Sequence, residues 1–378
     1  MNTLEWLSRL IAFDTTSRNS NLPLIKSVQD ELVKQGVDCR ITLSQDKQKA
    51  NLLATIPAAN GDLTGGVVLS GHTDVVPVDG QQWDTDPFVA TQKEGRVYGR
   101  GTCDMKGFVA VMLGLVPTLL KTKLTQPVRL AFSYDEEVGC KGVPALIEDL
   151  QQQGFKPNVC IVGEPTNMRP VIAHKGIQLF SCRLQGRAAH SSLTPMGCNA
   201  IEYAARLINH IRGMAERMRQ QGPFDTAFDV PFTTISVNKI QGGIARNIIP
   251  ESCEFTFEFR HLPEVQPQLL IDDIMGYIQN ELLPAMQSEF PTASIEMEKI
   301  GAAPSFESLD EAVVSHWTLE DKQKVSYATE AGFFQRAGIP TFVCGPGSIE
   351  QAHRPNEFVT LQQLTACEAF LKKVLINT

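Results

Sequence analysis

The chain has 378 residues, of which 43% are hydrophobic and 20% are charged, so it can bury a sizeable core and is not globally disordered. At about 150 residues per domain, this length indicates two or three domains. Its 34 basic and 42 acidic residues give a net charge of −8, and such an acidic chain lacks the basic footprint of a nucleic-acid-binding protein.

The N-terminal segment and the cysteines bear on the cellular compartment. The first twenty residues contain no basic segment followed by an apolar one, so we expect no signal peptide. No apolar run approaches the roughly 20 residues that span a bilayer. The nine cysteines include no C-x-x-C pair, which favours a reducing compartment over a disulfide framework. We therefore expect a cytoplasmic protein without a membrane partner.

Helical and strand patterns alternate through the first third of the chain. Helices are predicted at 4–13, 24–35, 104–120 and 143–153, and strands at 51–56, 66–71, 127–134 and 158–163. This alternation is typical of an α/β domain whose mostly parallel sheet is flanked by helices.

The middle of the chain has a different pattern. A strand is predicted at 176–184, a helix at 199–219, strands at 232–240 and 254–259, a helix at 268–287 and a strand at 293–300. This β-α-β-β-α-β order is that of a ferredoxin-like α+β unit. A strand at 339–344 and a helix at 361–375 then resume the α/β pattern. The sequence thus predicts one domain at 1–176 and 304–378, interrupted by an inserted domain at 177–303.

Two polar motifs follow or precede these elements. His72 and Asp74 come after a predicted strand and point to the same side of an extended chain. A carboxylate there can orient a ligating histidine, although a lone histidine is more often structural. Asp104 lies in Gly99–Gly107, where it replaces the third glycine of a G-x-G-x-x-G loop. A simple helix N-cap is the alternative for Asp104.

Acidic residues also follow two further predicted strands. Asp135, Glu136 and Glu137 end the strand at 127–134, and Glu164 follows the strand at 158–163. A solvated turn would accommodate three adjacent carboxylates, but a cation would remove their repulsion and leave one of them free as a base.

His353 lies in a later loop, after the Gly345-Pro346-Gly347 turn. Because ligands bind beyond the carboxyl ends of parallel strands, we expect His353 and the strand-end groups to converge there. A mixed set of imidazoles and carboxylates suits zinc, cobalt or manganese.

Taken together, these motifs resemble those of the two-zinc aminoacylase, carboxypeptidase and deacylase family of metallohydrolases, in the same order and over nearly the whole chain. The resemblance implies two divalent metal ions, zinc, with cobalt able to substitute. It also implies that Glu136 is the general base and that Asp74 orients His72. The metal ligands it implies are His72, Asp104, Glu137, Glu164 and His353, with Asp104 bridging the two ions.

The inserted domain carries further matches to this family. Gly186–Ser192 resembles a motif whose histidine crosses from the partner subunit of a dimer and stabilises the oxyanion, which makes His190 a catalytic candidate. Asn247 and Arg260 match substrate-binding positions. An arginine suits a bidentate grip on a substrate carboxylate, and a surface salt bridge is the alternative for Arg260. We therefore expect a homodimer formed through the inserted lid and dimerisation domain.

The segment at 328–335 bears on the substrate. Its Thr329-Glu330-Ala331 resembles the branch of the family that deacetylates acetylornithine, whereas desuccinylases usually carry a Gly-Thr-Ser-Asp type of segment there. Glu330 would pair with the δ-ammonium of that substrate, or it is simply a carboxylate at a helix N-terminus.

The resemblance therefore implies hydrolysis of N2-acetyl-L-ornithine to L-ornithine and acetate, a step of arginine biosynthesis. Three alternatives remain open. The chain is a deacylase of another N-acyl amino acid, a dipeptidase, or a non-catalytic relative that binds a metal or ligand.

Overall fold

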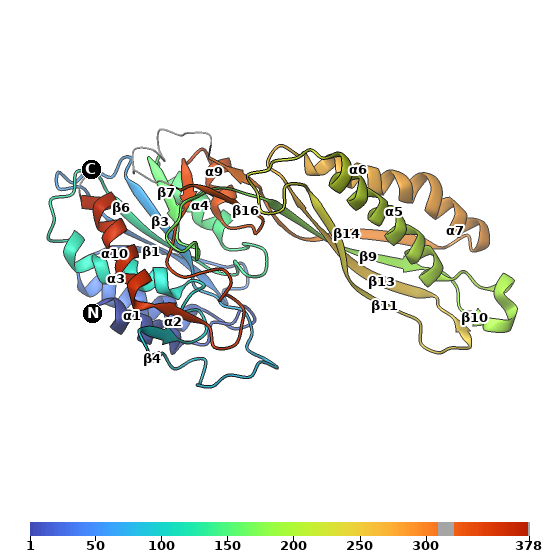
Figure 1. The fold of residues 1–378 in the computed structure, drawn as a ribbon, viewed down its shortest axis with the longest axis horizontal. Coiled ribbons are helices and arrows are strands. Elements are labelled where there is room, and N and C mark those ends of the chain that lie inside the picture. The colour runs from blue at the N-terminus through green and yellow to red at the C-terminus, as the bar shows by residue number, and fades with distance from the viewer. Residues whose placement is uncertain (309–320, 377–378) are drawn as a thin grey trace. The chain divides into compact units, whose positions relative to one another are not determined.

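The computed structural model describes residues 1–308 and 321–376. The chain divides into two compact units (Figure 1). Unit 1 comprises Met1–Ala173, Phe306–Gln323 and Thr329–Thr378, and unit 2 comprises His174–Ser305 and Lys324–Ala328. The short segment from Lys324 belongs to unit 2 because Lys324 pairs with Asp225 at 2.7 Å and the carbonyl of Val325 accepts from the backbone N–H of Lys175.

Unit 1 is built on a sheet with the order β1-β2-β6-β3-β7-β17-β8-β15; a ninth strand, β16, pairs with β8, and its Lys324 and Val325 belong to unit 2. The four central strands, β6, β3, β7 and β17, are parallel to one another. Every residue of these four strands is buried, as expected for a sheet covered on both faces. The strands are β1 (Asp38–Leu43), β2 (Ala50–Ile56), β3 (Val67–His72), β6 (Val128–Ser133), β7 (Val159–Val162), β8 (Val171–His174), β15 (Phe306–Glu307), β16 (Gln323–Val325) and β17 (Thr341–Val343).

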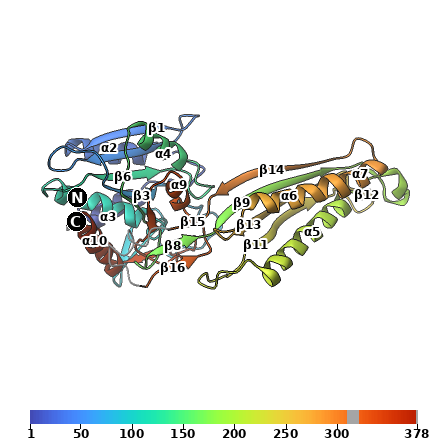
Figure 2. The ribbon, with the colours of Figure 1, turned by 90° about the horizontal axis from the view of Figure 1, so that it is seen from above.

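Helices cover both faces of this sheet. One face carries α1 (Thr3–Ile11), α2 (Leu22–Lys34), α3 (Lys106–Leu119) and α10 (Leu361–Ile376), whose buried residues share one hydrophobic core, and the other face carries α4 (Val143–Gln152) (Figures 1 and 2). Helix α3 is apolar on nearly all sides because it packs between β3 and the helices α1 and α10. The short α9 (Ala331–Arg336) packs against β17. The predicted α/β fold with a mostly parallel sheet is confirmed.

A small three-stranded sheet, in the order β18-β5-β4, was not predicted from the sequence. Its strands are β4 (Thr91–Lys93), β5 (Arg96–Tyr98) and β18 (Phe358–Thr360). Each strand is only three residues long, too short for a recognisable alternation of polar and apolar residues. The sheet joins the chain just before Gly99 to the chain just after Glu357.

Unit 2 is an antiparallel sheet in the order β11-β13-β9-β14, with helices on one face (Figure 2). Phe255, Phe257 and Phe259 of β13 point into its core, and the residues between them are half-buried. The β-α-β-β-α-β order confirms the predicted ferredoxin-like pattern. The elements are β9 (Gly176–Gln185), α5 (Ala200–Gln221), β11 (Thr234–Gly242), β13 (Ser252–His261), α6 (Pro267–Tyr277), α7 (Leu283–Glu289) and β14 (Ser294–Ala303).

One difference from the prediction lies in the second helical segment of unit 2. The sequence predicts a single helix at 268–287, but a π-helical turn at Ile278–Leu282 separates α6 from α7. Across the described residues, no helix is long and apolar enough to cross a membrane.

Candidate metal centre

Three neighbouring parallel strands deliver the candidate ligands. Strand β3 ends at His72, the chain leaving β6 reaches Glu136 and Glu137, and Glu164 follows β7 by two residues. Because these strands run in the same direction, their carboxyl ends meet at one edge of the sheet. The sequence-predicted strand-end groups are therefore brought together within unit 1.

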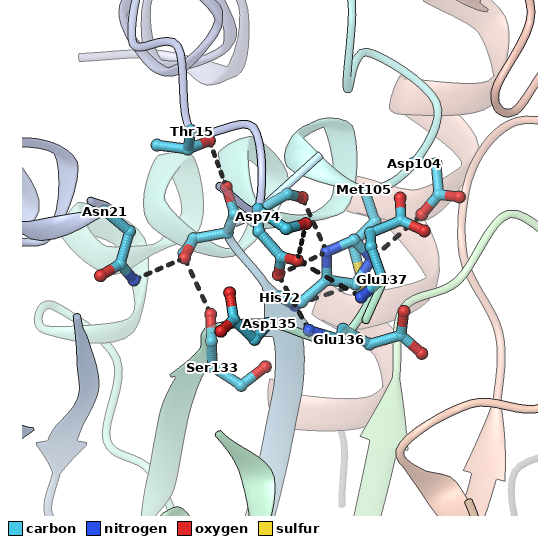
Figure 3. Close-up of polar contacts among 12 residues, drawn as sticks. Thr15, Asn21, His72, Asp74, Asp104, Met105, Ser133, Asp135, Glu136 and Glu137 are labelled. Carbon is cyan, nitrogen blue, oxygen red and sulfur yellow. Dashed lines mark hydrogen bonds and ion pairs between the residues drawn. The ribbon is translucent and has the colours of Figure 1, made fainter. Parts of the chain in front are cut away.

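His72 lies at the centre of this cluster and is 1% exposed. Its Nε2 is 3.0 Å from Oδ1 of Asp104 and 3.8 Å from Oε1 of Glu164. Figure 3 shows the imidazole between Asp74 and Asp104. The N-cap position of α3 is Met105, and the carboxylate of Asp104 faces His72 rather than the helix end. The alternative that Asp104 merely caps the helix is wrong.

The second histidine meets the same aspartate from the other side. Nε2 of His353 is 3.4 Å from Oδ2 of Asp104 and 3.0 Å from Oε2 of Glu137. Asp104 thus directs one oxygen to each histidine, which is the arrangement of a carboxylate that bridges two cations.

The donor set and its unpartnered atoms fit divalent metal ions. One group of potential ligand atoms, within 4.8 Å of one another, comes from His72, Asp104 and Glu137, and another comes from His72, Glu136 and Glu164. Oε1 of Glu137 and Oε1 of Glu164 are buried without a hydrogen-bond partner, and a cation would satisfy both. Imidazole nitrogens and carboxylate oxygens are ligands of zinc and related metals.

Burial and like charges perturb the acids of the cluster. Burial, followed by the charge of Asp104, raises the pKa of Glu137 from 4.5 to about 7. Burial also raises the pKa values of Glu136 and Glu164 well above their usual range. Hydrogen bonds to Asp104 and Glu137 raise the pKa of His353 to about 10. Without a cation, the cluster therefore retains protons that its groups release in water.

Asp74 does more than contact His72. Nδ1 of His72 lies 2.9 Å from the backbone carbonyl of Asp74 and 3.5 Å from its carboxylate. The same carboxylate accepts hydrogen bonds from the hydroxyl of Ser17 at 2.7 Å and from the backbone N–H groups of Glu136 and Glu137 at 3.1 and 3.3 Å (Figure 3). One buried carboxylate thereby connects the end of β3 to the turn after β6.

The turn after β6 separates its three acidic residues into two roles. The carboxylate of Asp135 forms an ion pair with Lys49, whose ammonium also donates to the backbone carbonyl of Ser17. The solvated-turn alternative therefore fails, because Asp135 has a cationic partner and both glutamates carry potential metal-binding atoms. Sequence reasoning missed Lys49, since no local pattern links it to a residue 86 positions away.

Arg100 and Glu357 form a second ion pair that was missed. They meet at 2.6 Å, and the side chain of each is 1% exposed. The only signal in the sequence is that each is a charged residue within a motif that supplies a candidate ligand.

Unit 2 holds the other catalytic candidate. His190 belongs to β10 (Ala189–His190), which pairs with β12 (Ile248–Ile249), and Asn247 immediately precedes β12. Both residues are exposed, and Nδ1 of His190 lies 2.8 Å from the hydroxyl of Ser192. His190 and Asn247 are therefore neighbours.

Arg260 lies elsewhere in the same unit. It is near the end of β13, eight residues from Ser252, or about 25 Å along the strand. Its guanidinium is 3.0 Å from Glu258, which is the ion pair that the alternative reading expected. Unit 2 of one chain therefore does not bring Arg260 together with His190 and Asn247.

Glu330 lies in unit 1 and is 1% exposed. It occupies the N-cap position of α9, but its side chain makes no capping hydrogen bond. One oxygen accepts from the hydroxyl of Ser70 at 3.3 Å, while Oε1 is buried without a hydrogen-bond partner. Burial raises the pKa of Glu330 to about 7, and its charge contributes to the raised pKa of Glu136. Glu330 therefore lies close enough to the cluster to interact with it.

Comparison with known sequences gives a consistent result. Residues 68–377 match the model of peptidase family M20/M25/M40. A protein of Pasteurella multocida named acetylornithine deacetylase is 36% identical over 383 residues, which cover 98% of this chain and 97% of that protein. A protein of the same name from Proteus mirabilis is 35% identical over 97% of this chain and 92% of its own length.

Solved structures share the fold. An M20 metallo-carboxypeptidase from Sulfolobus solfataricus superimposes with a TM-score of 0.75 at 19% identity, covering 98% of this chain and 99% of that one. A dinuclear metal-binding M20 peptidase from Bacillus subtilis gives a TM-score of 0.69 at 15% identity, covering 99% and 97%. These matches support the architecture described above.

The raised pKa values predict how the metal-free protein responds to pH. Between pH 4.5 and about 7 the folded state keeps a proton on Glu137 that the unfolded chain has released, so the free energy of unfolding falls as pH rises. His353 extends this loss from pH 6.5 to about 10. The pKa of Asp104 is lowered, so its opposing contribution lies below its usual value of 3.8.

Urea unfolding of chelator-treated protein from pH 5 to 8 measures this effect. Stability should fall across the range, and Glu137→Gln should reduce the slope. A flat or rising profile in the metal-free protein would contradict the analysis.

Proposed function

This chain belongs to peptidase family M20/M25/M40, and we propose that it is a metal-dependent amidohydrolase that cleaves N2-acetyl-L-ornithine to L-ornithine and acetate. The observation that carries the proposal is the position of Asp104 between His72 and His353, with Glu137 and Glu164 beside them at the carboxyl edge of the sheet.

The residues divide naturally between two ions. His72 and Glu164 would hold one, Glu137 and His353 would hold the other, and Asp104 would bind both. Two divalent cations in such a site polarise the substrate carbonyl and make a water molecule more acidic. Zinc suits this donor set, and cobalt should replace it.

Glu136 is the proposed general base. Burial raises its pKa well above that of an exposed glutamate and so makes it a stronger base, and the hydrogen bond from its backbone N–H to Asp74 fixes the turn that presents it. We propose that Glu136 accepts the proton of the attacking water and then delivers it to the leaving amine, as general acid–base catalysis requires.

The relatives and two charged residues support the substrate assignment. Relatives at 35–36% identity carry the name acetylornithine deacetylase. Glu330 has a buried carboxylate oxygen without a hydrogen-bond partner, which a substrate δ-ammonium would satisfy. Arg260 would bind the α-carboxylate. The product, L-ornithine, places the reaction in arginine biosynthesis.

We propose a homodimer in which His190 and Asn247 act at the partner's centre. Strand β9 leaves the junction between the units at Gly176 and runs to Gln185, about 30 Å away, before the chain reaches His190. Near that end, Leu193, Met196 and Ile244 are 55%, 56% and 88% exposed. Exposed apolar side chains gathered at one end of a unit support contact with a second copy.

A reducing cytoplasm is the proposed location. All nine cysteines lie within the described part of the chain, and each is a free thiol. Unpaired cysteines in this number favour a compartment in which thiols stay reduced.

Acetate release from a panel of N-acyl amino acids tests the proposed function. The protein is assayed after chelation, with and without added Zn²⁺ or Co²⁺. Metal-dependent release with a preference for N2-acetyl-L-ornithine is expected. Preference for another acyl amino acid would support metal-dependent amide hydrolysis but contradict the substrate assignment. Two bound metal ions without any hydrolysis would favour a binding protein.

Glu136→Gln should lower kcat by about 10²–10⁴-fold, because it removes proton transfer, while metal content stays at two ions per chain. Metal analysis alongside the assay shows whether Glu136 acts as a general base or as a metal ligand. Loss of one metal ion in this variant would instead identify Glu136 as a ligand. Its carboxylate is a candidate because the potential ligand atoms of His72, Glu136 and Glu164 lie within 4.8 Å of one another.

Glu330→Gln should raise KM for N2-acetyl-L-ornithine much more than for N-acetyl-L-methionine, because only the former carries a side-chain ammonium. Steady-state kinetics on both substrates measure the difference. An equal effect on the two substrates would remove the ammonium-pairing role.

His190→Ala should reduce kcat by about 10²-fold if the imidazole stabilises the oxyanion. Mixing equal amounts of His190→Ala and Glu136→Gln subunits should restore activity to about a quarter of the wild-type value. About half of the dimers are then mixed, and each mixed dimer has one intact centre of its two. Mixed protein with no recovered activity, or a monomer in solution, would contradict the proposed cross-subunit role.

A further inference from the structure

A buried ion pair connects the two loops that carry Asp104 and His353. Nη1 of Arg100 lies 2.6 Å from Oε2 of Glu357, and each side chain is 1% exposed. Arg100 precedes Asp104 by four residues, and Glu357 follows His353 by four residues. The pair therefore joins the loop of the bridging ligand to the loop of the second histidine.

Glu357 also fixes the backbone that leads to Asp104. Its Oε1 accepts from the backbone N–H groups of Cys103 at 2.8 Å and Asp104 at 3.0 Å. Its Oε2 accepts from the backbone N–H of Gly101 at 3.1 Å, in addition to Arg100. One carboxylate thus anchors three backbone groups, including that of the bridging ligand itself.

Arg100 acts on the opposite loop. Its Nη1 donates to the backbone carbonyl of Arg354 at 3.3 Å, and its Nη2 donates to Oε1 of Gln81 at 2.6 Å. The amide of Gln81 in turn donates to the backbone carbonyl of His353 at 2.9 Å. The guanidinium also lies over the ring of Trp83, 5.1 Å from its centroid. The backbone on both sides of the His353–Arg354 bond is therefore held.

The backbone of this second loop needs such anchors. His353 and Asn356 adopt positive φ values of 64° and 56°, a region that non-glycine residues enter at a conformational cost. The side chain of Asn356 is tied to Asp84, accepting from its backbone N–H at 2.9 Å and donating to its carboxylate at 3.1 Å. A loop with two such residues keeps one conformation only when its surroundings impose it.

We propose that Arg100 and Glu357 are positioning residues for the metal centre, holding Asp104 and His353 at the separation that the ion bound by Glu137 and His353 requires. The inference rests on the proposed function, since it presupposes two bound metal ions. Neither side chain is a ligand. They act through the backbone on which two ligands stand, in the way that outer-shell partners of metal sites set ligand orientation.

If the pair had a purely structural role, a variant that lacks it and still folds would keep its metal affinity. Replacing both members of a buried ion pair with apolar residues of similar volume costs little stability, whereas removing one member leaves a buried charge unpaired. Arg100→Met combined with Glu357→Leu therefore removes the ion pair without leaving either charge buried and unpaired. The double variant nevertheless loses the acceptor for three backbone N–H groups and the donor to Gln81, so it should bind metal poorly.

The test is a titration of chelator-treated full-length protein with Co²⁺, followed by calorimetry and by the visible absorption of bound cobalt. The wild-type protein should bind two ions. Glu357→Gln and the double variant should bind one of them about 10–100-fold more weakly, with thermal unfolding confirming that each folds. Arg100→Lys retains the charge but loses the forked donor geometry. Its affinity for the weakened cobalt ion should lie between that of the wild-type protein and that of the double variant.

Arg129→Met provides the matched control. Arg129 is also fully buried in unit 1, but it donates to the carbonyls of Leu63 and Gly65 and packs on Phe155. Its variant should lose stability and keep wild-type metal affinity. If Glu357→Gln, Arg100→Lys and the double variant all bound cobalt with wild-type affinity at both sites, the positioning role would be wrong, and the proposed function would be unaffected. A wild-type protein that binds no metal would instead overturn the proposed function.

Discussion

Carboxylates that repel one another meet at one edge of the parallel sheet, and the surrounding groups of unit 1 must offset that repulsion. Asp74, Asp104 and Glu164 are buried, and Glu136 and Glu137 join them from the turn after β6. Two histidines beside the carboxylates, and hydrogen bonds from two backbone N–H groups and one hydroxyl to Asp74, offset part of that repulsion. Burial, and after it the charges of neighbouring carboxylates, still raises the pKa values of the three glutamates. A pair of divalent cations would complete the compensation.

Most of the fold was predictable because it rests on local periodicity. The helices α1 to α5 and the central strands β2, β3, β6, β7 and β17 produce clear patterns of apolar residues and lie close to their predicted bounds. The short strands β4, β5 and β18 were missed because three residues carry no detectable period. The π-helical turn between α6 and α7 was missed as well, because its residues continue a helical pattern.

The candidate site shows the same division between local and distant information. The convergence of His72, Glu137 and Glu164 could be predicted because parallel strands share one edge. The ion pairs Lys49–Asp135 and Arg100–Glu357 could not, because they join residues 86 and 257 positions apart. No local pattern separates Arg260 from His190 and Asn247 either. That separation arises from the register of β13 within unit 2.

Anomalous X-ray diffraction at the zinc absorption edge, from crystals of the zinc-loaded protein, tests the central claim most directly. The account predicts two peaks about 3.5–4 Å apart, with the carboxylate of Asp104 between them, His72 and Glu164 on one ion, and Glu137 and His353 on the other. A single ion away from Asp104, or no ion at the carboxyl edge of β3, β6 and β7, would contradict it.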